Sequence, residues 1–136
     1  MKVVLDTNVL ISALVFPGGL PERIYGLALD GDIVLVTSSP LLVELARVLS
    51  HKFGWARSRV DRAVTQLLRV AELIEPRATV AEVKADPADN RVLEAAAESN
   101  ADVIVTGDRH FLRLKVWRGM AIDSPAAFAV RVRKPA

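Results

Sequence analysis

The stretch that decides the fold is KVVLDTNVLISALVF, residues 2–16. Its first four residues, Lys2 to Leu5, form a short and mostly apolar run that predicts a β-strand. The next three, Asp6 to Asn8, are residue types that end strands and cap helices. The apolar segment Val9 to Phe16 then predicts a helix, which the break at Pro17 ends. The opening is therefore strand, turn and helix, with an aspartate at the junction.

Strand and helix signals alternate along the rest of the chain. The predicted helices are Pro21–Ala28, Pro40–Lys52, Arg57–Leu73, one that begins at Asp86, and Arg109–Leu114. The predicted strands are Asp32–Thr37, Leu73–Glu75, Ala101–Thr106 and Met120–Ile122. The strands are apolar almost throughout, and such strands pack between helices on both faces of a parallel sheet. We therefore predict an α/β fold with a mainly parallel central sheet.

Length and composition limit the class of protein. With 136 residues, 51% of them hydrophobic, the chain fits one domain, because two would each be too small for a core. We expect this domain to cover residues 1–131 and a loose tail to follow at residues 132–136. The absence of cysteine excludes disulfides, thiolate zinc sites and a cysteine nucleophile. No apolar stretch approaches the ~20 residues that span a bilayer, so we expect a cytoplasmic protein that does not enter the membrane.

Charge is distributed unevenly along the chain. Residues 109–136 hold seven Lys and Arg residues against one acid, Asp123, a net charge of +6. Residues 1–108 hold 11 basic and 15 acidic residues, a net charge of −4. This asymmetry is compatible with a polyanionic ligand at the C-terminal part, and equally with a basic segment that only keeps the surface solvated.

Two aspartates follow strands that are far apart in the sequence. Asp6 follows the first strand, and Asp108 follows the strand Ala101–Thr106. Because ligands bind outside the carboxyl ends of parallel strands, we expect both carboxylates at one edge of the sheet. Each aspartate also precedes a helix, where an N-cap is worth about 1 kcal/mol. Taken alone, each residue fits the role of ligand or of cap.

Two further acids lie on predicted helices. Glu44 sits at the edge of the apolar face of its helix and is half turned toward the interior. The alternative is a surface ion pair with Arg47 or Lys52. Asp89 lies at a helix start, where Asp86 would be the N-cap and Asp89 the third helical position of a capping box. Helix formation alone would explain both aspartates.

The four acids as a set indicate a bound cation. If four carboxylates faced one edge of the sheet, their mutual repulsion would cost more free energy than helix capping contributes, unless a cation lay among them. Their oxygen ligands suit Mg²⁺ or Mn²⁺ rather than zinc. Such a site supports the attack of a metal-activated water on a phosphodiester, with one ion or with two.

Four segments of the chain also resemble a known family. They are Val3–Leu10, the helical Glu44, Asp86–Asn90 and Val105–Asp108. In this order, and over almost the whole chain, they resemble the four acidic signatures of the PIN-domain superfamily. Within it the chain is similar to the small bacterial and archaeal toxins of VapC-like toxin–antitoxin systems.

The resemblance implies a three-layer α/β/α sandwich and a Mg²⁺- or Mn²⁺-dependent endoribonuclease that hydrolyses RNA phosphodiester bonds. It also implies a homodimer and an antitoxin protein as partner. The family's catalytic and metal-binding quartet falls on Asp6, Glu44, Asp89 and Asp108. Its supporting polar positions fall on Thr7, Asn8 and Thr106. The threonines would orient carboxylates or simply cap helices, and Asn8 would support the site or be a turn residue.

The chain departs from the family after its last acidic signature. Where many relatives have a further acid, this chain has Arg109-His110-Phe111, which leaves the number of metal ions open. The residues expected to contact RNA are Arg109, His110, Arg113 and Lys115. The alternative is a solvated basic surface. Trp55 and Trp117 would stack on bases or a partner, or be buried, and His51 has no assigned role.

Two other classes compete with this interpretation. A phosphoryl-accepting fold of the haloacid-dehalogenase type would need a second aspartate two positions after Asp6, where Asn8 stands. A catalytically silent PIN fold that only binds RNA or protein is the main alternative. Retention of all four acids argues against it, because a scaffold has no reason to keep a repelling cluster.

Overall fold

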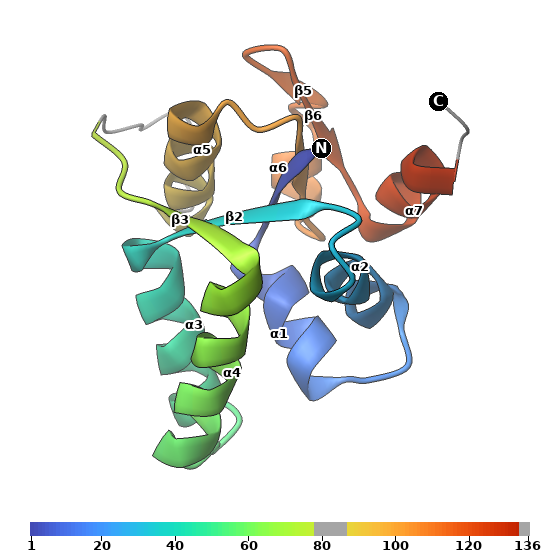
Figure 1. The fold of residues 1–136 in the computed structure, drawn as a ribbon. Coiled ribbons are helices and arrows are strands. Elements are labelled where there is room, and N and C mark those ends of the chain that lie inside the picture. Colours follow the sequence, from blue (N-terminus) through green and yellow to red (C-terminus); the bar gives the residue numbers. More distant parts are fainter. Residues whose placement is uncertain (78–86, 134–136) are drawn as a thin grey trace.

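The computed structural model describes residues 1–77 and 87–133, in which helices alternate with the strands of one six-stranded sheet (Figure 1). The strands are β1 (Lys2–Leu5), β2 (Val34–Ser38), β3 (Ala71–Ile74), β4 (Val103–Val105), β5 (Val116–Trp117) and β6 (Met120–Asp123). The helices are α1 (Thr7–Val15), α2 (Leu20–Leu29), α3 (Ser39–His51), α4 (Arg57–Val70), α5 (Pro87–Ser99), α6 (Arg109–Leu112) and α7 (Pro125–Arg133). Among these helices, none is long and apolar enough to cross a membrane.

The strands follow the order β3-β2-β1-β4-β6-β5. Every neighbouring pair is parallel except β5 and β6. Val3 on β1 lies between Leu35 of β2 and Val103 of β4, so β1 is central. Strands β2 and β3 extend the sheet on one side of β1, and β4, β6 and β5 extend it on the other side. The direction in which strands are added therefore reverses between β1 and β4. In open parallel sheets the carboxyl ends of two such strands border the usual ligand crevice.

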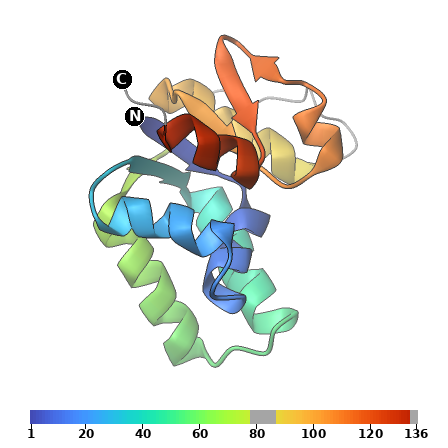
Figure 2. The ribbon, with the colours of Figure 1, turned by 90° about the vertical axis from the view of Figure 1, so that its right-hand side faces the viewer.

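Alternate residues of each strand fill two separate cores. Val3 and Leu5 face a core built with α1, α2, α3, α4 and α7, whereas Val4 faces a second core built with α5 and α6. Figures 1 and 2 show the sheet between these two groups of helices. Val4 and Ile104 are fully buried. The expected three-layer α/β/α sandwich with a mainly parallel sheet is confirmed.

Two elements were not predicted from the sequence. The short strand β5 forms a hairpin with β6 through Arg118 and Gly119, which both have positive φ, +48° and +80°. That geometry belongs to the two-residue hairpin turns in which Asn-Gly is the usual signal, and Arg-Gly is a poor one. The second element that was not predicted is helix α7. It contains Val132, which we expected to lie in a loose tail.

Residues 132 and 133, which were expected in a loose tail, form the end of α7. Val132 is half-buried and packs against the first core one helical turn beyond the fully buried Phe128. An apolar pair at that spacing holds the end of α7 in place. Residues 134–136 lie outside the described residues, as does Asp86, the expected N-cap of α5.

Candidate functional site

Asp6 lies where three elements meet. Its backbone N–H donates to Val105 of β4 (2.9 Å), and its carbonyl oxygen accepts from Val9 (2.9 Å) and Leu10 (3.1 Å) of α1. The residue is 4% exposed. Although Asp6 is the N-cap residue of α1, its carboxylate makes no capping hydrogen bond. The capping alternative for Asp6 is therefore wrong, because its side chain does not bond the backbone of α1.

Thr106 connects Asp6 to Asp108. Its hydroxyl donates to Oδ2 of Asp6 (2.7 Å) and accepts from the backbone N–H of Asp108 (3.1 Å). The residue is fully buried, and its own N–H donates to the carbonyl oxygen of Asp123 (2.9 Å). A threonine hydroxyl that donates once and accepts once has one fixed orientation. The Asp6 carboxylate is consequently held in place from the neighbouring strand end.

Asp108 does act as a helix cap. Its Oδ1 accepts from the backbone N–H groups of His110 (2.8 Å) and Phe111 (3.4 Å) at the start of α6. The side chain is half-buried. Within the described part of the chain, its Oδ2 has no hydrogen bond. Capping and ligand binding are therefore compatible here, because they use different oxygens of the same carboxylate.

The other two predicted acids lie on helices α3 and α5, which pack against the sheet. Asp89 is 2% exposed in the first turn of α5, and Glu44 is half-buried in the middle of α3. Helices α3 and α5 contact each other and β2. Among residues 1–77 and 87–133, no three His, Asp or Glu side chains form a group that could hold a metal ion. The structure thus connects Asp6 with Asp108 through Thr106, and the full quartet stays a prediction.

Two buried threonine hydroxyls close to the carboxyl ends of β1 and β2 bear on whether the residues fit a cation. Within the described residues, Oγ1 of Thr7 and Oγ1 of Thr37 have no hydrogen-bond partner, and each threonine is 2% exposed. Leaving such a group unsatisfied costs about 1–3 kcal/mol. Thr7 adjoins Asp6, and Thr37 lies near the end of β2, the neighbour of β1. Hydroxyl and carboxylate oxygens are donors of the kind that Mg²⁺ and Mn²⁺ bind, directly or through water, so the chemistry of the donors present is compatible with these cations.

Sequence reasoning missed an ion pair at the next strand end. Asp123 ends β6, is 7% exposed and receives two hydrogen bonds from Arg131 of α7, at 2.7 Å (Nε) and 3.1 Å (Nη2). The hydrogen bond from Arg131 to Asp123 raises the pKa of the guanidinium. An acid directly after the apolar run Met120–Ile122 was the available signal, the same one that singled out Asp6. This third strand-end carboxylate is neutralised within the chain.

The residues expected to contact RNA lie on the surface beside Asp108. The exposed residues are Arg109, His110, Arg113 and Lys115. A cavity of about 260 Å³ next to them is lined by Asn8 and Ser12 of α1 and by Gly107 and Asp108, among others. The exposed Asn8 thus faces the same hollow as Asp108.

The two tryptophans occupy different environments. Trp117 is 6% exposed in the second core, which confirms burial for that residue. Trp55 is half-buried, and the guanidinium of Arg59 lies 3.8 Å from its ring centre. His51 is exposed at the end of α3.

Asp6 is buried at the carboxyl end of the central strand β1, and Thr106 links it to Asp108, which follows the neighbouring strand β4. This arrangement is that of an α/β protein with an acidic site at its strand ends. Comparison with known families matches residues 2–110 to the PIN domain. The chain belongs to the PIN-domain family.

The chain is also similar to individual proteins. An uncharacterized protein of Methanocaldococcus jannaschii is 37% identical over 119 residues, which cover 85% of this chain and 76% of that protein. The crystal structure of VapBC2 from Rickettsia felis, bound to a DNA fragment from their promoter, matches with a TM-score of 0.66 and 19% identity, covering 91% of this chain and 98% of that one. A solved protein of Pyrobaculum aerophilum matches with a TM-score of 0.57 and 19% identity, covering 98% and 90%. At such identities these structures show the shared fold.

Proposed function

We propose that this PIN domain is a Mg²⁺- or Mn²⁺-dependent endoribonuclease that hydrolyses RNA phosphodiester bonds, and that it is the toxin of a toxin–antitoxin pair. The observation that carries the proposal is the carboxylate of Asp6. It is buried, is not used as a cap and is held by Thr106, which also binds the backbone of Asp108. Burying a charged carboxylate costs free energy, and a cation bound at this edge would offset that cost.

The proposed site divides its tasks among named residues. Asp6, Glu44, Asp89 and Asp108 hold the cation, with Oδ2 of Asp108 as the oxygen that capping leaves available. When bound, the cation activates water and neutralises charge on the phosphoryl oxygens. Thr106 fixes the Asp6 carboxylate, and Thr7 and Asn8 are the other supporting polar residues. Arg109, His110, Arg113 and Lys115 hold the RNA backbone beside Asp108.

The proposed partners follow from the family and from one structural neighbour. The Rickettsia felis structure is of VapBC2 with a promoter DNA fragment. By analogy, we expect this chain to bind an antitoxin protein, to form a homodimer and to act in the cytoplasm. We predicted one nuclease domain over residues 1–131, and we now extend it to the end of α7 at Arg133.

The deciding experiment measures Mn²⁺ binding and RNA cleavage in Asp6→Asn and Asp108→Asn. Each change removes a charged oxygen ligand, so Mn²⁺ affinity should fall by at least about tenfold and cleavage should be lost. Asp61→Asn is the matched control, because Asp61 is exposed on α4 and should change neither quantity. Unchanged Mn²⁺ affinity in both site variants would contradict the metal site. RNA binding without metal binding or cleavage would instead favour the catalytically silent PIN domain.

A further inference from the structure

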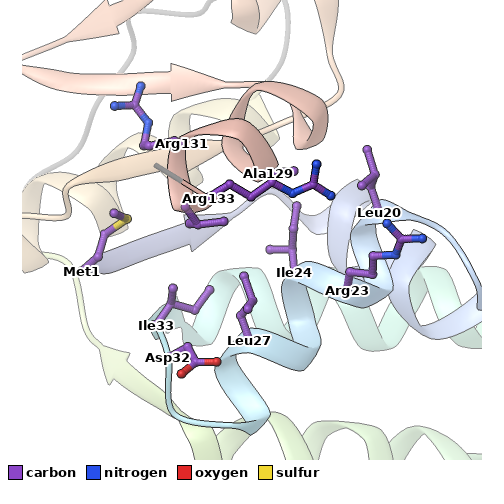
Figure 3. Close-up of a pocket in the computed structure, with 11 residues that line it drawn as sticks. Met1, Leu20, Arg23, Ile24, Leu27, Asp32, Ile33, Ala129, Arg131 and Arg133 are labelled. Atoms are coloured by element: carbon purple, nitrogen blue, oxygen red, sulfur yellow. The ribbon is translucent and has the colours of Figure 1, made fainter. Parts of the chain in front are cut away.

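A cavity with a mostly apolar lining lies away from the acidic edge of the sheet (Figure 3). It has a volume of about 570 Å³, within the range of pockets that hold small organic ligands. Its walls come from one face of α2 and from the last turns of α7. Met1 and Ile33, which immediately precede β1 and β2, also line it, so it opens at the amino ends of these strands.

The inner surface of this α2–α7 pocket is apolar. Leu20, Ile24 and Leu27 line it at helical spacing along α2, and Ala129 and Val132 face them from α7. Ile24 is 1% exposed and forms part of the first core. The pocket floor is therefore rigid, and an apolar group that enters it would be removed from water.

The charged groups of the pocket are separated along its length. In Figure 3 the guanidinium groups of Arg23 and Arg133 both lie toward the Leu20 end, whereas Asp32 lies at the opposite end, below Ile33. Arg131 points away and is engaged with Asp123. Within the described residues, neither Arg23 nor Arg133 takes part in an ion pair.

We propose that the α2–α7 pocket is a binding site for a small anionic amphiphile, with its carboxylate or phosphate head between Arg23 and Arg133 and its apolar body along α2 toward Met1. Guanidinium forks bind both kinds of head group through charge-assisted hydrogen bonds. Asp32 disfavours the reverse orientation, because it would repel an anion at the Met1 end. This site is independent of the proposed nuclease site, since none of the predicted quartet lines it.

The chain contains two methionines, which allows a direct test. Met1 lines the pocket, whereas Met120 is 7% exposed in the second core and serves as an internal control. We would titrate methyl-labelled protein with octanoate and with octyl phosphate, and use 1-octanol, acetate and inorganic phosphate as controls. A saturable shift of the Met1 methyl signal without a shift of Met120 is expected for the two amphiphiles alone. Their relative affinities would identify the preferred head group.

Substitutions separate specific binding from general adsorption. Arg23→Gln and Arg133→Gln should each weaken octanoate binding by roughly fivefold, and Arg62→Gln, an exposed arginine on α4, should leave it unchanged. Ala129→Trp should fill the pocket and abolish the shift. Equal affinity for octanol and octanoate, unchanged affinity in both pocket variants, or no Met1 shift at all would overturn the proposal. If Ala129→Trp fails to fold, the two arginine variants decide alone.

Discussion

A substitution of Thr106 tests the link between the two aspartates of the proposed site. Its hydroxyl serves Asp6 and Asp108 at once, at 2.7 and 3.1 Å, and it is fully buried. Thr106→Val keeps the shape of the side chain but removes both hydrogen bonds. We expect Mn²⁺ affinity to fall by about 10–100-fold, as when a group that orients a metal ligand is removed. Isothermal titration with Mn²⁺ measures this effect.

A purely structural role for Thr106 would give a different pattern. Thr106→Ser restores the hydroxyl and should recover most of the metal affinity, even if loss of the methyl group lowers stability by about 1 kcal/mol. If valine and serine lower stability but leave Mn²⁺ affinity equal to that of the natural protein, Thr106 only fills space.

Tyr25 gives a prediction that is independent of the metal site. Burial raises its pKa from the ordinary value of 10 to about 12. Its hydroxyl donates to Gln66 of α4 at 3.3 Å. The folded state keeps the proton where the unfolded chain loses it, so its contribution to stability is complete below pH 10 and is lost as the pH rises toward 12. We expect a loss of up to about 2 kcal/mol over that interval.

The single tyrosine of the chain makes this measurable. Tyrosinate absorbance should titrate at a higher pH in the folded protein than in urea. The unfolding free energy of the natural protein relative to that of Tyr25→Phe should fall as the pH rises from about 10 to about 12. A normal tyrosinate titration in the folded protein would contradict the burial of this hydroxyl.

The positions of individual acids were only partly readable from the sequence. The strand-then-aspartate pattern located Asp6 and Asp108 at one edge of the sheet, and the Thr106 hydrogen bonds connect that edge. The sequence could not predict which aspartate caps its helix, because capping depends on the orientation of the side chain. In the structure Asp108 caps α6, whereas the side chain of Asp6 does not cap α1. Asp123 was missed because its pairing with Arg131 depends on the packing of an unpredicted helix.

At the scale of elements, the sequence predicted most helices and strands but not β5 and α7. The long elements have clear periodicity, such as α4 with its apolar face and exposed arginines. Helix α7 is short and its apolar residues are not confined to one face, so it lacks a clear helical pattern, although Ser124-Pro125 was a usable start signal. The Ser124 hydroxyl indeed accepts from the N–H of Ala127 (3.1 Å).

Helix α7 should depend on the ion pair that joins it to β6. Arg131→Met would leave the carboxylate of Asp123, which is 7% exposed, without its partner. The Arg131 side chain is 43% exposed, so the expected cost lies between those of surface and buried pairs, about 2 kcal/mol. Urea unfolding with an unchanged slope would measure this loss of stability.

The neighbouring arginine supplies the matched control for that change. Arg133→Met lies on the same helix and, within the described residues, breaks no ion pair, so it should cost less than about 0.5 kcal/mol. Adding Asp123→Asn to Arg131→Met should recover part of the loss, because it removes the buried charge. Equal losses for the two arginine variants would mean that the pair contributes nothing to the docking of α7.

At the scale of the whole molecule, the two edges of the sheet differ in chemistry. Asp6, Thr106 and Asp123 gather where β1, β4 and β6 end, whereas the α2–α7 pocket opens where β1 and β2 begin. The sequence predicted the first edge because strand ends follow from the strand pattern. It could not predict the second, since that pocket requires α2 and α7 to lie side by side.

The net charge of +6 in residues 109–136 leads to a prediction about where RNA lies. Arg109, Arg113 and Lys115 are exposed directly after Asp108. If they bind phosphates, RNA affinity should fall with salt, and changing all three to glutamine should make that dependence shallower by about 0.7 for each phosphate that is no longer bound. The measurement is RNA binding over a salt series in the Asp6→Asn background, which is expected not to cleave.

The control must remove the same charge from another surface. Arg57, Arg62 and Arg69 are exposed on α4, and their triple change to glutamine lowers the net charge equally. If proximity to Asp108 matters, only the first triple variant should flatten the salt dependence. With the natural Asp6 restored, the same triple variant should keep its Mn²⁺ affinity, because arginine and lysine cannot be cation ligands. If the α4 variant has the larger effect, the RNA runs along α4 instead. Equal small effects would show that both surfaces act through net charge alone.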